Sequence, residues 1–273
     1  MTQYTRDPDE PAGETERAKL SNLPVYLINL DGSDDRLAEA RRQLDIAGVP
    51  FERVPAFDGR ELRIEEFPDY APESAMSYMG RPLRGGEIGC YLSHIDCARR
   101  FLDTSAPACV VLEDDMKLRA GFPEGTEAVI DWLQQNDPSW EVVNIGANSL
   151  KIHTPALRFG PGDRPYQLSR AHYFPTTTTG LIWSRAGASA LIQQHERIFA
   201  PVDLYLRHWQ TRRNRGWAVL PGLVTTTGVD SVIAPGISPR REAGDRHILY
   251  GLIKQRRVWL NKIEAYRNRW RMR

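Results

Sequence analysis

The densest group of chemically active side chains in this 273-residue sequence is the acidic run Glu113-Asp114-Asp115. The run follows Ala108–Leu112, a short apolar segment typical of a buried strand. Three adjacent carboxylates repel one another unless a cation offsets their charge, and alternate residues of an extended segment point the same way. Mg²⁺ and Mn²⁺ are commonly held by one or two carboxylates together with substrate phosphates. Glu113 and Asp115 are therefore candidate metal ligands, and a solvated acidic loop or a helix N-cap cluster is the simpler alternative.

A second polar group lies on the segment that follows Gly85-Gly86, which we expect to be a helix from Glu87 to about Leu102. Glu87 and His94 are seven residues apart, which places them on one face of that helix, with Cys90 between them. A polar stripe on a helix otherwise suited to burial suggests the lining of a cleft. A capping Glu and a satisfied, half-buried His explain the same residues more simply.

Two isolated residues have a functional and a structural interpretation each. Arg36, near the start of the first expected helix, can contact a nucleotide or phosphate, or pair on the surface with Asp34 or Asp35. Asp203 follows Pro201-Val202, where a helix is expected to begin, and an isolated Asp at that position is usually an N-cap. Spacing alone does not give either residue a binding or catalytic role.

These side chains are positioned by an alternation of apolar strands and amphipathic helices. We expect strands at 25–30, 51–56, 108–112 and 142–145, and helices at 36–47, 87–102, 124–135 and 185–194. The proline-containing stretch 59–84 is expected to be irregular. This alternation implies an α/β sandwich with a mostly parallel sheet, in which ligands lie at the carboxyl ends of the strands. That edge carries Asn29–Asp31 as well as the acidic run.

Composition separates an acidic body from a basic tail. The chain is 41% hydrophobic and 26% charged with a formal net charge of +1, which excludes a globally basic nucleic-acid binder. From Arg240 to Arg273 there are 11 Lys and Arg against 3 Asp and Glu, whereas the first 239 residues hold 25 against 32. Apolar and basic residues interleave in 240–273, so this tail is expected to be an amphipathic helix. It either packs with its apolar side on the body or lies on an anionic membrane surface, and nucleic-acid binding is the least suitable use.

The termini and the cysteines indicate a compartment. Residues 1–22 lack apolar periodicity and are expected to be a flexible leader, with no signal region and no membrane-spanning run in the sequence. Cys90, Cys97 and Cys109 are too few and too clustered for a disulfide framework, and their spacing matches no zinc signature. We therefore expect a cytoplasmic protein, either free or peripheral on the inner face of the membrane. The absence of G-x-G-x-x-G after the first strand excludes a nicotinamide-dependent dehydrogenase.

Several sequence blocks follow one another in an order that is more specific than any single block. The first four are Val25–Asp31 with Arg36, Val54–Gly59, Gly86–His94 and Val111–Asp115, and the later ones are Asn144–Gly146, Gly180–Ala188, Pro201–Asp203 and Pro221–Ile233. In this order they resemble the motifs of glycosyltransferase family 25, which includes bacterial lipopolysaccharide galactosyltransferases and collagen galactosyltransferase domains. The third block, G-E-I-G-C-Y-L-S-H, carries the resemblance most strongly. Residues 23–239 are accordingly expected to form one glycosyltransferase domain.

The resemblance implies a GT-A type nucleotide-diphosphosugar transferase fold, a UDP-sugar donor, commonly UDP-galactose, and a bound Mn²⁺ or Mg²⁺. It implies transfer with inversion to a glycan or lipid-linked acceptor of the lipopolysaccharide type or another surface glycan. A sugar-nucleotide-binding scaffold without turnover is the alternative from another class. Thr176–Trp183 departs from the family pattern at a segment expected to face the transferred sugar or the acceptor, which leaves the sugar itself open.

Site residues follow from the same resemblance, position by position. The nucleotide end would be lined by Asn29, Asp31 and Arg36, the donor pocket by Glu87, Ser93, His94 and Asp114, and the ribose, diphosphate and metal would contact Glu113 and Asp115. Inversion also requires a carboxylate that accepts the proton of the attacking hydroxyl. Asp203 is the first candidate for this base, because it lies after the expected acceptor loop, and Asp230 is the second.

Overall fold

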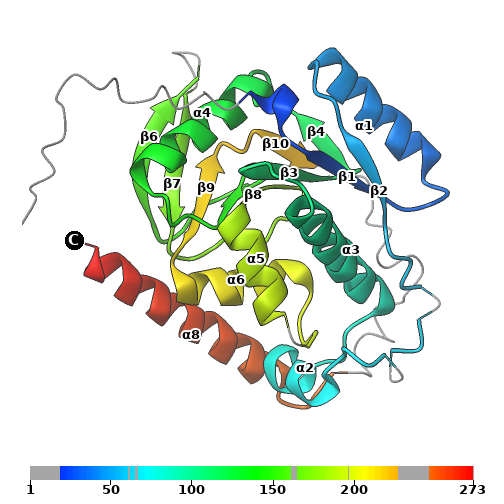
Figure 1. Cartoon of the computed structure of the whole chain (residues 1–273). Helices are drawn as coiled ribbons and strands as arrows, with labels where there is room; N and C mark the ends of the chain where they lie inside the picture. The colour runs from blue at the N-terminus through cyan, green and yellow to red at the C-terminus, as the bar shows by residue number, and fades with distance from the viewer. Residues whose placement is uncertain are drawn as a thin grey trace, which may run out of the picture.

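A computed structural model describes residues 19–60, 62–64, 67–160, 165–195, 197–226 and 246–272 of the chain. In this part an eight-stranded sheet lies between two layers of helices (Figure 1). The strand order is β2 (Glu52–Pro55), β1 (Val25–Asn29), β3 (Ala108–Glu113), β8 (Gly180–Ser184), β5 (Val142–Asn144), β9 (Gly216–Leu220), β7 (Tyr166–Ala171) and β6 (His153–Phe159). No helix among the described residues is both long enough and apolar enough to cross a membrane.

Most strands of this sheet point the same way, as the sequence predicted. Strand β1 pairs in parallel with β2 and β3, and β5 pairs in parallel with β9. Strand β8 is antiparallel to both β3 and β5, and β7 is antiparallel to both β9 and β6, so only these two strands of the sheet are reversed. A separate antiparallel pair, β4 (Met116–Leu118) with β10 (Val224–Thr226), follows the acidic run.

Burial on both faces explains the continuous apolar strands. All five residues of β1 are buried, and the first four alternate between two cores. Tyr26 and Ile28 pack in the core formed with α3 (Gly85–Leu102), α5 (Arg185–Gln194) and α6 (Val202–Arg213), and Val25 and Leu27 pack with α1 (Asp34–Ile46) and α4 (Phe122–Asn136). Short apolar runs therefore identified β1, β3 and β5 correctly.

The prediction that residues 59–84 are irregular is wrong in part, because α2 (Pro72–Met79) lies within them. Pro72 occupies the first turn, where a helix needs no N–H from it, and Gly80 ends the helix with a φ of 73°. A proline read as a helix breaker is here the start of a helix. None of the strands β6 to β10 was among the expected ones. Strand β6 is largely exposed and lacks an apolar run, whereas β8 and β9 are buried apolar runs that the sequence analysis did not assign as strands.

Two glycines allow the chain to approach itself closely beside the carboxyl edge of the sheet. A Cβ on Gly85 would lie 1.7 Å from the carbonyl oxygen of Gly59, and one on Gly89 would lie 2.3 Å from the carbonyl oxygen of Phe57. The segment 56–60 therefore packs directly on the first turns of α3. This contact fixes one wall of the cleft described below.

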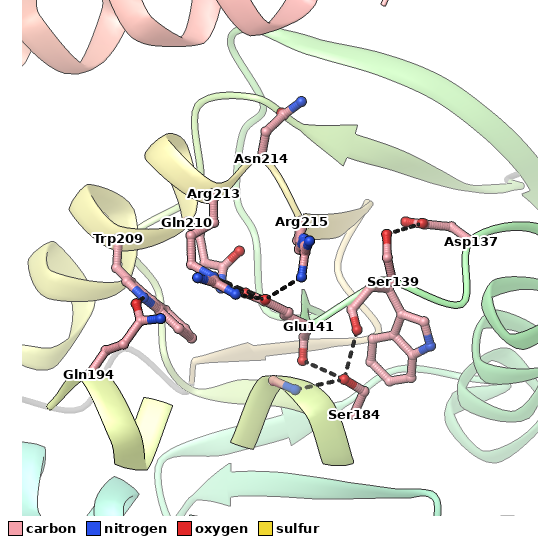
Figure 2. A network of polar contacts seen from close by, with 12 residues as sticks. Asp137, Ser139, Glu141, Ser184, Gln194, Trp209, Gln210, Arg213, Asn214 and Arg215 are labelled. Atoms are coloured by element: carbon pink, nitrogen blue, oxygen red, sulfur yellow. Dashed lines mark hydrogen bonds and ion pairs between the residues drawn. The ribbon is translucent and has the colours of Figure 1, made fainter. Parts of the chain in front are cut away.

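A buried carboxylate anchors the C-terminal end of α6 (Figure 2). Glu141, which is 1% exposed, accepts hydrogen bonds from the Nε2 of Gln210 at 2.9 Å and from the Nε of Arg213 at 2.7 and 2.9 Å, and Arg215 lies 3.4 Å away. The backbone of Glu141 also accepts from the N-cap of α5, the Ser184 hydroxyl. The network fixes the direction of α6, whose other end carries Asp203.

Glu141→Gln is expected to lower the free energy of unfolding by about 2–3 kcal/mol, because it removes the buried negative charge that pairs with the half-buried Arg213 and the exposed Arg215. Chemical denaturation measures this loss. The exposed pair of Glu39 and Arg42 on α1 provides the control, and Glu39→Gln should leave stability nearly unchanged, because solvent screens an exposed ion pair. Equal effects of the two substitutions would contradict the anchoring role.

The two ends of the described chain both pack on the body. Leu20, in a short 3₁₀ turn at Leu20–Asn22, is 1% exposed, so one residue of the expected leader 1–22 belongs to the core. The tail forms α8 (Tyr250–Arg271), which lies across α2 and α6 (Figure 1). It buries Asn261, Ala265 and Asn268 and leaves most of its large apolar residues exposed, although Ile253 and Val258 are half-buried. The helix therefore docks on the body, but not with the apolar side that one alternative required. The expected boundary at residue 240 lies outside the described residues.

Candidate functional site

The carboxyl ends of β1 and β3 open into two adjoining cavities. The first, of about 730 Å³ including its opening to solvent, is lined by Ile28, Leu30, Ser33, Arg36, Ala56, Phe57, Asp58, Arg60, Gly86, Cys90, Ser93, Glu113, Asp114 and Asp115. The second is lined by Arg81, Arg84, Glu87, Cys90, Glu113, Thr176–Thr179, Pro201, Val202, Asp203 and Leu204. Cys90 and Glu113 line both cavities. A ligand that occupied both cavities would pass Glu113.

Asp114, the middle residue of the acidic run, is neutralised by the protein itself. The Nη1 of Arg36 lies 3.1 Å from its Oδ1, and the amide of Asn29 donates to its Oδ2 at 2.8 Å. The amide oxygen of Asn29 is in turn held by the Nε of Arg53 at 2.9 Å. Through these contacts with Asn29 on β1 and Arg36 on α1, Asp114 connects both elements with the end of β3. Its charge is compensated without a cation.

Glu113 is held in place by a histidine from α3. The Nε2 of His94 lies 3.0 Å from the Oε1 of Glu113, and the imidazole is 2% exposed. Burial alone would raise the pKa of Glu113, but the hydrogen bond and charge of His94, with help from Thr178 and Arg36, outweigh it and lower the pKa. Glu113 is therefore an oriented, ionised carboxylate at the junction of the two cavities.

Asp115 differs from its neighbours because its Oδ1 is buried and has no hydrogen-bond partner. Burial, together with the charges of Glu113 and Asp114, raises its pKa to about 6. A buried carboxylate oxygen without a partner is costly unless a ligand supplies one. Glu113 and Asp115 together offer the hard oxygen donors that Mn²⁺ and Mg²⁺ prefer, so the residues present fit such a cation.

A different set of ligand atoms, from Cys90, His94 and Glu113, also lies within 4.8 Å of one another in the described part of the chain. Burial raises the pKa of the Cys90 thiol well above its usual value, so the thiol stays protonated at neutral pH. A thiol is also a soft ligand that Mn²⁺ and Mg²⁺ do not favour. This set therefore fits those cations less well than the two carboxylates do.

Not every predicted donor-binding residue reaches the cavities. Asn29 is 1% exposed and lies beneath Asp114, whereas the side chain of Asp31 is 79% exposed and pairs with Arg53 outside both walls. Ser93 lines the first cavity, but its hydroxyl donates to the carbonyl of Gly89 and accepts from the backbone N–H of Phe57. Ser93 therefore fixes the segment 56–60, which forms one wall of the cleft, against α3. Asp230 lies outside the described residues.

Glu87 has the structural role that its simpler interpretation required, and it also faces the second cavity. It accepts from the backbone N–H of Arg84 at 2.9 Å as part of a capping box, and it forms a two-point ion pair with Arg81 at 2.6 and 2.8 Å. The sequence analysis did not single out Arg81 and Arg84. Their position just before a Gly-Gly helix start, where anions tend to bind, was the available signal.

Asp203 lies in the first turn of α6 and faces the second cavity together with Glu113. Its Oδ1 accepts from the backbone N–H of Leu204 at 2.7 Å. Burial raises its pKa to about 6, with smaller contributions from the charges of Glu87 and Glu113, while Leu204 and Arg207 oppose the rise. A carboxylate of this kind can take up a proton near neutral pH.

His94→Ala is expected to act on the cleft through Glu113. Without the imidazole, Glu113 loses its hydrogen bond, so we expect Mn²⁺ affinity at neutral pH to fall about tenfold. The free energy of unfolding should fall by about 2 kcal/mol for the lost buried group. Calorimetric titration with Mn²⁺ and chemical denaturation measure the two effects. His94→Gln, which keeps a donor on a side chain of similar length, should recover part of the affinity. A loss of stability with Mn²⁺ affinity intact would show that His94 is only a core residue.

Comparison with known proteins identifies relatives of this chain. The sequence profile described as glycosyltransferase family 25 (LPS biosynthesis protein) matches residues 22–206, well over half of the chain. Procollagen galactosyltransferase 1-A of Xenopus laevis is 28% identical over 197 residues, which covers 69% of this chain and 31% of that protein. A glycosyltransferase 25 family member of Anopheles gambiae is 26% identical over 227 residues, covering 77% and 37%. The chain thus spans about a third of the length of these curated relatives.

Among solved structures, a glycosyltransferase involved in the glycosylation of the major capsid of PBCV-1 is similar over 77% of this chain and 94% of its own. Its sequence identity is 10% and its TM-score is 0.38. The likeness is too low to support conclusions about the site.

Proposed function

Because the chain belongs to glycosyltransferase family 25, we propose that it is a metal-dependent, inverting hexosyltransferase that moves galactose from UDP-galactose to a hydroxyl of an acceptor glycan. One observation carries the proposal. The cleft brings together an oriented Glu113, an Asp115 whose Oδ1 is buried without a partner, and in the second cavity a carboxylate with a raised pKa, Asp203. These groups match the separate tasks of holding a donor diphosphate and accepting a proton.

The first cavity suits the nucleotide end of the donor. The phenyl ring of Phe57, which is 44% exposed, offers a stacking surface, and the guanidinium of Arg36 provides a positive charge on the same wall. Asn29 and Asp114 contribute by fixing Arg36 rather than by touching the donor. In this assignment the sugar extends past Glu113 into the second cavity.

Glu113 and Asp115 are the residues that would hold Mn²⁺ or Mg²⁺. A bound divalent cation stabilises the negative charge that develops on a departing diphosphate. The contribution of the chain is to keep Glu113 ionised through His94 and to keep the unpartnered Asp115 oxygen turned away from competing donors. Both effects prepare the carboxylates before the donor binds.

Asp203 is the proposed general base. The acceptor oxygen forms a bond to C1 of the sugar while the bond from C1 to the UDP oxygen breaks, and the hydroxyl proton passes to Asp203. UDP leaves with the bonding electron pair, and the configuration at C1 is inverted. Because the pKa of Asp203 is about 6, most of the carboxylate is ionised at pH 7 and remains basic enough to accept the proton.

The acceptor is assigned by class. Thr176–Thr179 line the second cavity between Glu113 and Asp203, which is where the transferred sugar and the acceptor would meet. The family description names LPS biosynthesis, and the Xenopus laevis relative is named for procollagen. We favour a lipopolysaccharide-type or other surface glycan as the acceptor.

The test is a donor screen with Mn²⁺ present. UDP-galactose, UDP-glucose and UDP-N-acetylglucosamine are supplied in turn, and both binding heat and released UDP are measured. We expect UDP release with UDP-galactose and its loss in EDTA. Tight donor binding without UDP release, even with a panel of glycan acceptors, would support a sugar-nucleotide-binding scaffold instead. Full activity in EDTA would contradict the metal dependence.

A further inference from the structure

Helix α8 presents a stripe of large apolar side chains to solvent. The stripe is formed by Leu252, Trp259, Ile263, Tyr266 and Trp270, which are 67, 61, 50, 59 and 77% exposed. Their spacing of seven, four, three and four residues places them on one side of the helix. Asn261, Ala265 and Asn268, the buried residues of α8, lie on the opposite side. A helix that used its apolar face for the fold would show the reverse arrangement.

The docked side explains why the apolar side remains available. Asn268 donates to the backbone carbonyl of Thr211 at 2.7 Å, and Asn261 accepts from Arg212 at 3.2 Å, both on α6. At the other end, the guanidinium of Arg257 donates to the backbone carbonyl of Tyr78 on α2 at 3.2 Å. These polar contacts hold α8 in a defined orientation on the body. The stripe is therefore presented by the folded protein, not by a loose tail.

Basic residues border the stripe on both sides. Within Tyr250–Arg271 there are seven Lys and Arg residues and a single acidic residue, Glu264. At 100° per residue, Arg256 and Arg267 fall on one side of the stripe and Lys262 and Arg269 on the other. A second copy of this helix, packed face to face, would bring two such positive borders together.

We propose that this outward face of α8 is a docking surface for an anionic lipid bilayer. Its composition fits that partner, because Trp and Tyr favour the boundary between water and hydrocarbon, and Lys and Arg beside an apolar stripe attract anionic headgroups. The surface lies parallel to the helix axis, as an interfacial helix requires. A bilayer satisfies both the apolar stripe and its positive borders, which a second copy of the chain does not.

The place of α8 connects this surface with the cleft. The backbone N–H of His247, just before α8, donates to the carbonyl of Gly80 at 2.8 Å, and Tyr250 packs against Gly80. Gly80 directly precedes Arg81, which lines the second cavity. Docking would therefore hold the proposed acceptor side of the cleft near the membrane, where a lipid-linked glycan lies. This last step rests on the proposed function, whereas the docking itself does not.

The test is flotation of the full-length protein with vesicles of phosphatidylcholine, alone or mixed with phosphatidylglycerol. We expect binding to the mixed vesicles at low salt, weaker binding at high salt, and quenching of Trp fluorescence by brominated lipid. The triple variant Leu252→Gln, Trp259→Gln, Trp270→Gln keeps every charge and should bind more than about tenfold more weakly. Ile46→Gln is the matched control, because Ile46 is 74% exposed on α1, and it should bind as the unaltered protein does.

Release of UDP from UDP-galactose and the melting temperature should be unchanged in both variants, because none of these residues lines the cleft. A full-length protein that ignores the mixed vesicles at low salt would overturn the proposal. Equal binding by the triple variant would overturn it as well. So would an oligomer, seen by ultracentrifugation, that the triple variant dissociates, since the face would then join copies of the chain. Each readout is independent of whether the donor is turned over.

Discussion

Asp203→Asn is expected to lower turnover by about 10²–10⁴-fold and, at the same time, to make the protein more stable at neutral pH. The amide cannot accept the proton of the acceptor hydroxyl, which accounts for the loss of activity. It still has an oxygen that can accept from the N–H of Leu204, so the first turn of α6 is preserved. The gain in stability arises because the ionised carboxylate is buried at a cost that the neutral amide does not incur.

The sign of the pH dependence follows from the direction of the shift. The pKa of Asp203 is raised from 3.8 to about 6, so the folded state holds the proton more tightly than the unfolded state does. Ionisation therefore destabilises the fold as the pH rises from about 4 through about 6. Below about pH 4 the variant and the unaltered protein should differ little, and above about pH 7 the variant should be more stable by about 2 kcal/mol.

Chemical denaturation across this pH range measures the effect, with Asp35→Asn as the control. Asp35 is also in the first turn of a helix, α1, but it is exposed. Its replacement should lower the free energy of unfolding by only a few tenths of a kcal/mol, and this loss should not change between about pH 6 and pH 8. For the unaltered enzyme, kcat/KM should fall as the pH drops below about 6, because the base becomes protonated. Full turnover in Asp203→Asn would show that another residue is the general base, and Asp230 would be the next candidate to test.

Strands β1, β3 and β5 could be predicted from sequence because each is a short apolar run between turn residues, whereas the equally buried β8 and β9 lie next to β5 in the sheet and were not expected. Val25–Asn29 and Ala108–Glu113 are buried on both faces, and such strands need no information from distant parts of the chain. The exposed strand β6 and the helix α2 gave no comparable signal, since β6 is shaped by its pairing with β7 and α2 begins at a proline. Pairing and helix capping depend on context that local composition does not contain.

The acidic run could be located from sequence, but its three members could not be distinguished. Asp114 is compensated by Arg36 and Asn29, which are 78 and 85 residues away, and Glu113 is oriented by His94 from another helix. Only these distant partners leave Asp115 as the one with an unpartnered oxygen. The same applies to α8, whose amphipathic composition was clear from sequence but whose docked side depends on polar contacts with α6.

Asp115→Asn is expected to abolish metal-dependent turnover, by about 10²–10³-fold, without loss of the fold. The change removes the negative charge, at constant volume, from the carboxylate whose buried Oδ1 has no hydrogen-bond partner in the protein. Because burial and neighbouring charges raise the pKa of Asp115, the neutral amide should leave the metal-free protein as stable as before or more stable by about 1 kcal/mol, after allowance for partial exposure.

Metal binding provides a readout that is separate from activity. Mn²⁺ should raise the melting temperature of the unaltered protein, because a ligand that binds only the folded state stabilises it, and Asp115→Asn should lose most of this increase. Asp114→Asn is the matched control within the same run. It breaks the ion pair with Arg36 at 3.1 Å, so it should lower the stability of the metal-free protein. If Asp115→Asn keeps the full Mn²⁺-dependent increase, the cation is held by other residues, and the Cys90, His94 and Glu113 group becomes the site to test.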